Sequence, residues 1–288
     1  MKILILGSSG LLGRNIYSYL KRKKLDIIHN GLRKRILDLK NINNLKILLK
    51  NNPDIIINAA AETDINICEG FSKKSSKINV NLAHNLFLLK KKLNLEFKVI
   101  FFSTDQIYNS KKLSKENDNV SIFNNYSYQK VMAEKIYLNN KSVIFRTNFF
   151  GKGIGSKKSF SDWVYSCFKS GKKFTLFKDI VFNPLRIDTL CLVIYRIIRD
   201  KKIDNYGVYN LGSKGSISKS NFAILFAKKV GIYNNLYLLC NSSSILKVKR
   251  PKNMAMNIKK FEKFYNIKLP NIKNEIINES KKYINVKI

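Results

Sequence analysis

The first thirteen residues place the strongest constraint on the fold of this chain. A short apolar run, Lys2–Leu6, ends at three glycines spaced as Gly7-x-x-Gly10-x-x-Gly13, and a helical pattern follows to about residue 23. Strand, glycine-rich turn and helix form the local context of a dinucleotide-binding motif. There the turn lets the backbone approach a pyrophosphate at the helix N-terminus. The sequence therefore predicts a nucleotide-binding domain that begins with the first strand.

The following segments alternate between strand and helix patterns. Apolar, β-branched runs predict strands over 26–30, 53–58 and 98–102, with helices over 41–51 and from Asn79 or Asn81 to about residue 92 between them. Alternation of this kind predicts a parallel sheet covered by helices on both faces. The expected fold class is α/β: a Rossmann-type doubly wound parallel sheet with a smaller, discontinuous C-terminal substrate domain.

The pattern loosens after Phe150, where helices are predicted over 160–170, 187–199 and 221–230 and short strands over 174–177 and 208–211. We assign residues 1–148 and 184–212 to the nucleotide-binding domain. Residues 149–183 and 213–288 form the predicted substrate domain. Trp163 is expected in the core, on the inner face of its helix.

The cofactor preference depends on the end of the second predicted strand, where an NAD site usually places an acidic residue on the ribose hydroxyls. No acidic residue follows residues 26–30, and Arg33 could accommodate the 2′-phosphate of NADP. The sequence therefore favours NADP(H), with NAD as the alternative. The predicted cofactor contacts are Gly7, Ser9, Gly10, Leu11, Leu12, Gly13, Arg33, Asp38, Leu39, Ala59, Ala60, Ala61, Asn79, Ser103, Tyr126 and Lys130.

A proton-donating set is predicted between residues 98 and 130. The strand over 98–102 leads into Ser103-Thr104-Asp105, at the sheet edge that faces the ligand crevice. Tyr126 and Lys130 lie one turn apart on a predicted helix, so the ammonium can sit beside the phenol. A nearby cation favours the ionised phenol and lowers its pKa toward the range of a general acid. Thr104, Tyr126 and Lys130 are therefore the predicted catalytic residues for reduction of a carbonyl.

The spacing from tyrosine to lysine is weak support by itself. Seven of the fourteen tyrosines have a lysine four residues on: Tyr17, Tyr19, Tyr108, Tyr126, Tyr137, Tyr165 and Tyr283. Tyr126 is selected by its context, because it opens a helix one loop after the hydroxyl-bearing strand end.

The formal charge of +35, from 54 basic and 19 acidic residues, invites a nucleic-acid function. The lysines are spread along the whole chain, however, with no basic arm, zinc finger or RNA-binding motif. We expect no nucleic-acid partner; the basic surface would instead attract an anionic substrate such as a nucleotide sugar.

Four scattered cysteines and two histidines argue against a disulfide framework or a metal site. No run of eighteen apolar residues appears and no signal peptide precedes the first strand, so we expect a cytoplasmic protein with no membrane partner.

In order and spacing, these motifs resemble the extended short-chain dehydrogenase/reductases, and more narrowly the dTDP-4-dehydrorhamnose reductase family. The matching segments are the glycine motif, Asn58-Ala-Ala-Ala61, Ser103-Thr-Asp105, Tyr126-x-x-x-Lys130, Phe145-Arg-Thr147, Tyr206–Leu211, Arg250-Pro-Lys-Asn253 and Ile267-Lys-Leu-Pro270. The resemblance implies an NADP-dependent reductase of a nucleotide-activated 4-keto-6-deoxysugar, in deoxysugar or surface-polysaccharide biosynthesis. The hydride would come from the nicotinamide and the proton from Tyr126; a homodimer stays open.

The resemblance also implies roles for individual side chains. Thr104 would hydrogen-bond the carbonyl oxygen, and Lys130 would hold the nicotinamide ribose. The expected substrate contacts are Thr63, Asp105, Asn148, Phe149 and Arg250. A guanidinium grips phosphate with two parallel hydrogen bonds, so Arg250 is assigned to the substrate pyrophosphate, against the alternative of a surface arginine. Residues 106–108, 148–150 and 183–185 depart from the family pattern near the sugar.

Other functions stay open at this point. The regulatory subunit of methionine adenosyltransferase resembles the same family and works by binding a partner, without catalysis. A nucleotide-sugar epimerase is the nearest catalytic alternative. A dehydratase would need an Asp-Glu pair beside the threonine, and Asp105-Gln106 supplies half of it.

Overall fold

The structure is a computed structural model that describes residues 1–32, 35–154 and 158–284. The chain divides into two compact units, each assembled from three segments. Unit 1 comprises Met1–Thr104, Ile122–Arg146 and Cys191–Tyr209; unit 2 comprises Asp105–Ser121, Thr147–Leu190 and Asn210–Ile288. The sequence prediction places residues 105–121, 147–148, 184–190 and 210–212 in the nucleotide-binding domain, whereas in the structure they group with unit 2.

The central sheet has six strands in the order β12-β7-β6-β5-β1-β2. The strands are β1 Lys2–Leu6, β2 Asp26–His29, β5 Ile55–Asn58, β6 Lys98–Thr104, β7 Val143–Thr147 and β12 Gly207–Leu211. β1 pairs in parallel with β2 on one side and with β5 on the other, and β5 pairs in parallel with β6. The predicted Rossmann-type parallel sheet is confirmed. Strands are added on one side of β1 with β2 and on the other side from β5 onward, so the strand order reverses between β1 and β5. In sheets of this kind the ligand crevice lies at the carboxyl ends of the two strands where the order reverses.

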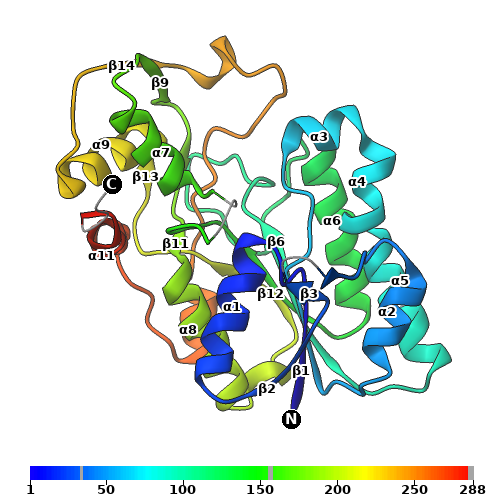
Figure 1. The fold of residues 1–288 in the computed structure, drawn as a ribbon. Coiled ribbons are helices and arrows are strands. Elements are labelled where there is room, and N and C mark those ends of the chain that lie inside the picture. The colour runs from blue at the N-terminus through cyan, green and yellow to red at the C-terminus, as the bar shows by residue number, and fades with distance from the viewer. Residues whose placement is uncertain (33–34, 155–157, 285–288) are drawn as a thin grey trace. The chain divides into compact units, whose positions relative to one another are not determined.

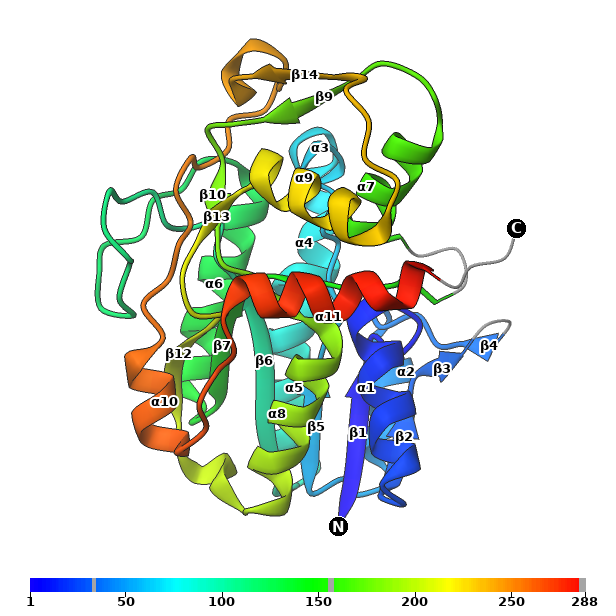
Figure 2. The same ribbon diagram turned by 90° about the vertical axis from the view of Figure 1, so that its left-hand side faces the viewer.

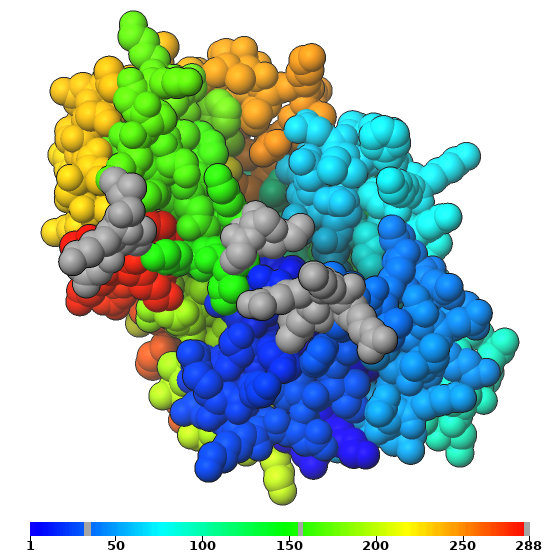
Figure 3. Space-filling model, viewed as in Figure 1, coloured from blue at the N-terminus to red at the C-terminus, as the bar shows by residue number. Residues whose placement is uncertain are grey.

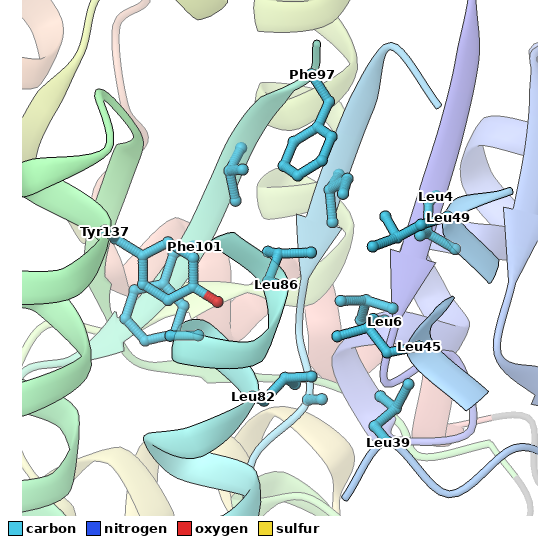
Figure 4. Close-up of a cluster of buried hydrophobic side chains, with 14 of the residues drawn as sticks. Leu4, Leu6, Leu39, Leu45, Leu49, Leu82, Leu86, Phe97, Phe101 and Tyr137 are labelled. Carbon is cyan, nitrogen blue, oxygen red and sulfur yellow. The ribbon is translucent and has the colours of Figure 1, made fainter. Parts of the chain in front are cut away.

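Helices cover both faces of the sheet in unit 1 (Figures 1 and 2). Alternate side chains such as Leu4 and Phe101 point to one face, where they pack against α2 Ile42–Leu49, α5 Asn81–Lys92 and α6 Asn125–Asn139 (Figure 4). On the other face lie α1 Leu11–Arg22 and α8 Ile187–Arg199, where the rings of Tyr19 and Tyr195 are 6.0 Å apart. The outer side of α1, dark blue in Figure 3, forms part of the surface of unit 1.

Three smaller elements of unit 1 lie near the carboxyl ends of the strands. A two-stranded antiparallel hairpin, β3 Gly31–Leu32 and β4 Arg35–Ile36, follows β2. Two short helices, α3 Ile65–Gly70 and α4 Ser72–Asn79, precede α5 and are not predicted from the sequence. Asn79, predicted near the start of a helix, is the last residue of α4.

Unit 2 packs helices α7 Phe160–Lys169, α9 Lys219–Val230 and α11 Ile272–Ile284 around an aromatic core that includes Phe168, Phe222 and Phe226. Its short strands form three pairs: β9 Phe174–Phe177 with β14 Tyr237–Cys240, β10 Val181–Phe182 with β13 Ile217–Ser218, and β8 Phe149–Phe150 with β11 Leu185–Arg186. Helix α10 spans Lys259–Tyr265, and single 3₁₀ turns span Lys202–Asp204 (in unit 1) and Ser242–Ser244.

Trp163 is not in the core, contrary to the prediction. Its side chain is 41% exposed and stacks on Phe160 at the surface of α7, with 5.7 Å between the ring centroids. Across the described part of the chain, no helix combines the length and apolar character needed to cross a bilayer.

Candidate active site

The glycine motif forms a tight loop between β1 and α1. Gly7 adopts φ +82°, and a Cβ built there would lie 2.5 Å from the backbone nitrogen of Ala60 at the end of β5. A Cβ on Gly13 would lie 2.2 Å from the carbonyl oxygen of Gly7. Glycine is therefore required at both positions, since any side chain would push the loop away from the strand ends. The loop leaves the N-terminus of α1 open to a pyrophosphate.

Asn30, which the sequence analysis did not single out, holds this loop in place. Its Oδ1 accepts hydrogen bonds from the backbone nitrogens of Gly7 (2.9 Å) and Ser8 (3.0 Å) and from the Ser8 hydroxyl (2.9 Å). The side chain is only 3% exposed. At the end of β2, where an NAD site would carry an acid for the ribose, this chain thus has a neutral amide committed to the glycine loop.

The other predicted cofactor residues of unit 1 are distributed around the same strand ends. Ser9, Gly10 and Leu11 are half-buried in the loop, and Ala59 to Ala61 continue directly from β5. Leu12 and Leu39 are buried, Leu39 within the core of Figure 4, whereas Asp38 is exposed and could face an adenine. Arg33 lies outside the described residues.

The three predicted catalytic residues all belong to unit 1. Thr104 is the last residue of β6 and is 3% exposed; Tyr126 and Lys130 lie on one face of α6 and are 7% and 2% exposed. Helix α6 begins where it does because Asn124 and Ser127 form a capping box around its first turn. The Lys130 Nζ donates a 2.6 Å hydrogen bond to the carbonyl oxygen of Phe102. That bond fastens the Tyr126–Lys130 face of the helix to the end of β6.

Lys130 is a strongly perturbed lysine. Burial lowers its pKa from 10.5 to about 7, against the opposing effects of the Glu134 carboxylate and the Cys68 thiol. Its ammonium also lies 4.2 Å from the ring centroid of Phe101. A titratable group with this combination of desolvation and neighbouring charge is characteristic of functional sites.

The Ser103 hydroxyl is the clearest sign that a ligand completes the site. It is buried, and among the described residues it has no hydrogen-bond partner. Buried hydroxyls are rarely left unsatisfied, so a polar ligand group at this strand end would remove an energetic cost. Together with the glycine loop, this hydroxyl fits a dinucleotide laid across the carboxyl ends of β1, β5 and β6.

The side chain of Asn79 has its hydrogen bonds inside the protein. Its Oδ1 accepts from the backbone nitrogen of Glu62, and its Nδ2 donates to the carbonyl oxygen of Glu62 (3.0 Å) and to Gln129 Oε1 (2.7 Å). Gln129 in turn donates to Ser75 Oγ and to the carbonyl oxygen of Ser72. The amide therefore joins the loop at residue 62 to α6, beside the catalytic face.

A buried ion pair holds the same helix one turn further along. Arg146 on β7 contacts both carboxylate oxygens of Glu134, with Nε to Oε1 at 3.0 Å and Nη2 to Oε2 at 2.7 Å. The side chains are 7% and 4% exposed. Because Glu134 lies one turn after Lys130, this pair also fixes the carboxylate that favours the charged lysine.

Two of the other tyrosines followed by lysine are structural. The Tyr137 hydroxyl accepts a 2.6 Å hydrogen bond from Asn58 Nδ2, and burial raises the pKa of this phenol. The Tyr283 hydroxyl donates to Asp162 Oδ1 at 2.7 Å, and burial again raises its pKa.

The predicted substrate residues, apart from the exposed Thr63, belong to unit 2. Asn148 Nδ2 donates to Asp105 Oδ2 at 2.9 Å, and Phe149 begins β8 next to this pair. Arg250 is half-buried. Within the described ranges no three histidine, cysteine, aspartate or glutamate side chains could together hold a metal ion.

The fold and the arrangement around β6 and α6 define a Rossmann-type oxidoreductase that uses a nicotinamide dinucleotide. The family model of the RmlD substrate binding domain matches residues 1–284, and the chain belongs to this family. The dTDP-4-dehydrorhamnose reductase of Escherichia coli K12 is 28% identical over 231 residues, which cover 76% of each chain.

Solved structures show the same fold. A dTDP-4-dehydrorhamnose reductase from Clostridium acetobutylicum, 25% identical, superposes with a TM-score of 0.86 over 98% of this chain and 99% of that one. The Bacillus anthracis reductase in complex with NADP, 22% identical, also gives a TM-score of 0.86, over 98% and 99% of the two chains.

Proposed function

We propose that the protein is an NADPH-dependent reductase of a nucleotide-activated 4-keto-6-deoxysugar, in deoxysugar and surface-polysaccharide biosynthesis. The observation that carries the proposal is the Tyr126–Lys130 face of α6, fastened to the end of β6 within two residues of Thr104. The family membership and the relatives named as dTDP-4-dehydrorhamnose reductases support the substrate class. The NADP complex of a relative with the same fold supports the cofactor.

NADPH, when bound, supplies the hydride. The loop from Gly7 to Gly13 would hold its pyrophosphate, and Ser103 and Lys130 would hold its nicotinamide end. The Tyr126 hydroxyl donates its proton to the carbonyl oxygen of the sugar, and the Thr104 hydroxyl donates a hydrogen bond to the same oxygen. The ammonium of Lys130 stabilises the phenolate that remains.

The substrate contacts would come from unit 2. The Asp105–Asn148 pair presents a carboxylate and an amide beside Phe149, a combination suited to the hydroxyls and the ring face of a sugar. Arg250 would bind the diphosphate with two parallel hydrogen bonds. Thr63, exposed on its loop in unit 1, is a further proposed contact.

The test is consumption of NADPH by the purified protein in the presence of 4-keto-6-deoxysugars linked to TDP, UDP or GDP, with NADH in parallel. We expect turnover with one of these sugars, and a preference for NADPH. Tyr126→Phe should keep NADPH affinity and lose about 10²–10⁴-fold in turnover, because the proton donor is removed. Tyr128→Phe is the matched control, since that tyrosine is 48% exposed on the same helix.

Three outcomes would redirect the proposal. Wild-type turnover in Tyr126→Phe would remove this tyrosine from the proton-transfer role. Sugar conversion without net consumption of NADPH would indicate an epimerase. NADPH binding without conversion of any sugar, together with co-purification of a larger partner, would indicate a regulatory subunit.

A further inference from the structure

Lys219 is an unusual lysine of unit 2. It is the first residue of α9, and its backbone nitrogen donates a 2.8 Å hydrogen bond to the carbonyl oxygen of Ile180. The side chain is partly buried against two aromatic rings: Nζ lies 5.4 Å from the centroid of Phe160 and 6.0 Å from that of Phe182. In the described part of unit 2, its ammonium makes no hydrogen bond and no ion pair, whereas Lys252 pairs with Asp179 at 3.4 Å.

The charges around Lys219 do not balance. Arg250 and Lys219 are brought near each other by β10, which pairs with β13 on one side and with the chain after Arg250 on the other, where Val181 N donates to the Lys252 carbonyl oxygen at 2.7 Å. The guanidinium of Arg250 disfavours the charged form of Lys219, and the Asp105 carboxylate opposes this effect only in part. Burial, followed by Arg250, lowers the pKa of Lys219 from 10.5 to about 8. Two half-buried cations beside one carboxylate repel each other in the free protein. An anion bound between the two cations would be attracted to both and would outweigh their repulsion.

The surroundings also indicate which anion this cluster suits. Lys219 offers an ammonium with unused donors and Arg250 a planar guanidinium, a combination that matches several phosphate oxygens better than a single carboxylate. Lys219 is the first residue of α9, a helix of 12 residues, so the positive end of the helix dipole adds to the local positive charge. The rings of Phe160 and Phe182 lie on one side of this ammonium.

We propose that Lys219 is the second cation of a diphosphate grip, and that Lys219 and Arg250 together bind the diphosphate of the nucleotide-linked substrate. The inference rests on the proposed function for the identity of the substrate. A role for Lys219 beside Arg250 explains why a partly buried lysine at the start of α9 has no partner among the described residues of unit 2.

Binding of TDP, UDP and GDP, measured by titration calorimetry, tests this grip without any turnover. We expect wild type to bind at least one of the three, and Lys219→Met to weaken that binding by about 10–100-fold, the usual size of a lost charge-assisted hydrogen bond. Lys219→Arg, which keeps the charge, should bind within a few-fold of wild type. Lys229→Met removes an exposed lysine of the same helix and should change nothing.

The pH dependence gives a second readout that a merely structural lysine would not produce. As the pH rises through about 8, wild type should lose nucleotide affinity because Lys219 loses its charge. Lys219→Arg should not, since a guanidinium stays protonated there. Arg250 and Asp105 are the charged groups that act on Lys219, and Arg250 stays protonated as well.

The outcomes separate this inference from the proposed function. If Lys219→Met binds the nucleotides as tightly as wild type, or if wild type binds none of them, the grip is refuted whatever the reductase assay shows. If no keto sugar is reduced but Lys219→Met still loses nucleotide affinity, the grip stands and the proposed reaction fails. Unchanged NADPH affinity and circular dichroism in each variant show that the protein is folded.

Discussion

Replacing Lys130 by methionine should stabilise the folded protein while removing its activity. Burial holds the pKa of Lys130 at about 7 in the folded state, compared with 10.5 for a free lysine. At 1.36 kcal/mol for each pKa unit, keeping this ammonium charged costs about 5 kcal/mol of stability below pH 7. Methionine has nearly the same length and no charge, so it removes this cost. It also loses the hydrogen bond to the Phe102 carbonyl, worth about 2 kcal/mol.

The sign and the pH window follow from the lowered pKa. Between about pH 7 and pH 10.5 the unfolded chain binds more protons at Lys130 than the folded protein does, so the destabilising contribution of Lys130 shrinks as the pH rises through this range. Lys130→Met has no such dependence. Its advantage should therefore be about 3 kcal/mol near pH 6 and should shrink to about zero near pH 9, where about 2 kcal/mol of the cost remains.

Urea unfolding followed by far-UV circular dichroism at these two pH values measures the difference. Tryptophan fluorescence is unsuitable, because the single tryptophan, Trp163, lies in unit 2 while Lys130 lies in unit 1. Lys135→Met, an exposed lysine of α6, is the matched control and should show no such change with pH. A Lys130→Met protein that is less stable than wild type near pH 6, or whose advantage is the same at both pH values, would refute the reasoning.

Three further predictions concern unit 1. Arg146→Met leaves the Glu134 carboxylate buried without its partner and should lower the free energy of unfolding by about 3–5 kcal/mol; adding Glu134→Gln should restore part of the loss in the same urea titration. Gly13→Ala places a Cβ 2.2 Å from the Gly7 carbonyl oxygen and should weaken NADPH binding by about 10-fold or more, as fluorescence titration of NADPH would show; unchanged affinity would contradict the tight loop. Lys141 has φ +47° after α6, so Lys141→Gly should stabilise the protein by about 0.5–1 kcal/mol, and a lower melting temperature would contradict this.

Local sequence determines much of the fold of unit 1, and the misses have physical causes. The strand-turn-helix around the glycine motif is predictable because all its determinants lie within about twenty residues. The helix Ser72–Asn79, by contrast, has the sequence SKKSSKIN, with a single large apolar residue and therefore no helical apolar pattern. It is fixed by side-chain hydrogen bonds such as Gln129 to Ser75, which only the folded chain brings together.

The catalytic residues and their supports differ in the same way. Tyr126 and Lys130 are four residues apart, so helix geometry alone puts them on one face. The contact of Asn30 with Gly7 spans 23 residues and that of Asn79 with Gln129 spans 50. No short-range pattern identifies such partners, because an asparagine in a polar chain looks the same whether it faces water, a cofactor or another side chain.

Burial separates functional cations from the background in this chain. With 54 lysines and arginines and a formal charge of +35, the presence of a lysine at a given position says little, and half of the tyrosines have one four residues on by composition alone. Desolvating an ammonium is costly, so composition bias does not explain why a lysine is buried. Lys130 and Lys219 both have pKa values lowered by burial, to about 7 and about 8. Lys130 lies beside the proposed proton donor, whose phenolate it would stabilise. Lys219 lies beside the proposed phosphate-binding arginine, where a bound diphosphate would offset the cost of its burial.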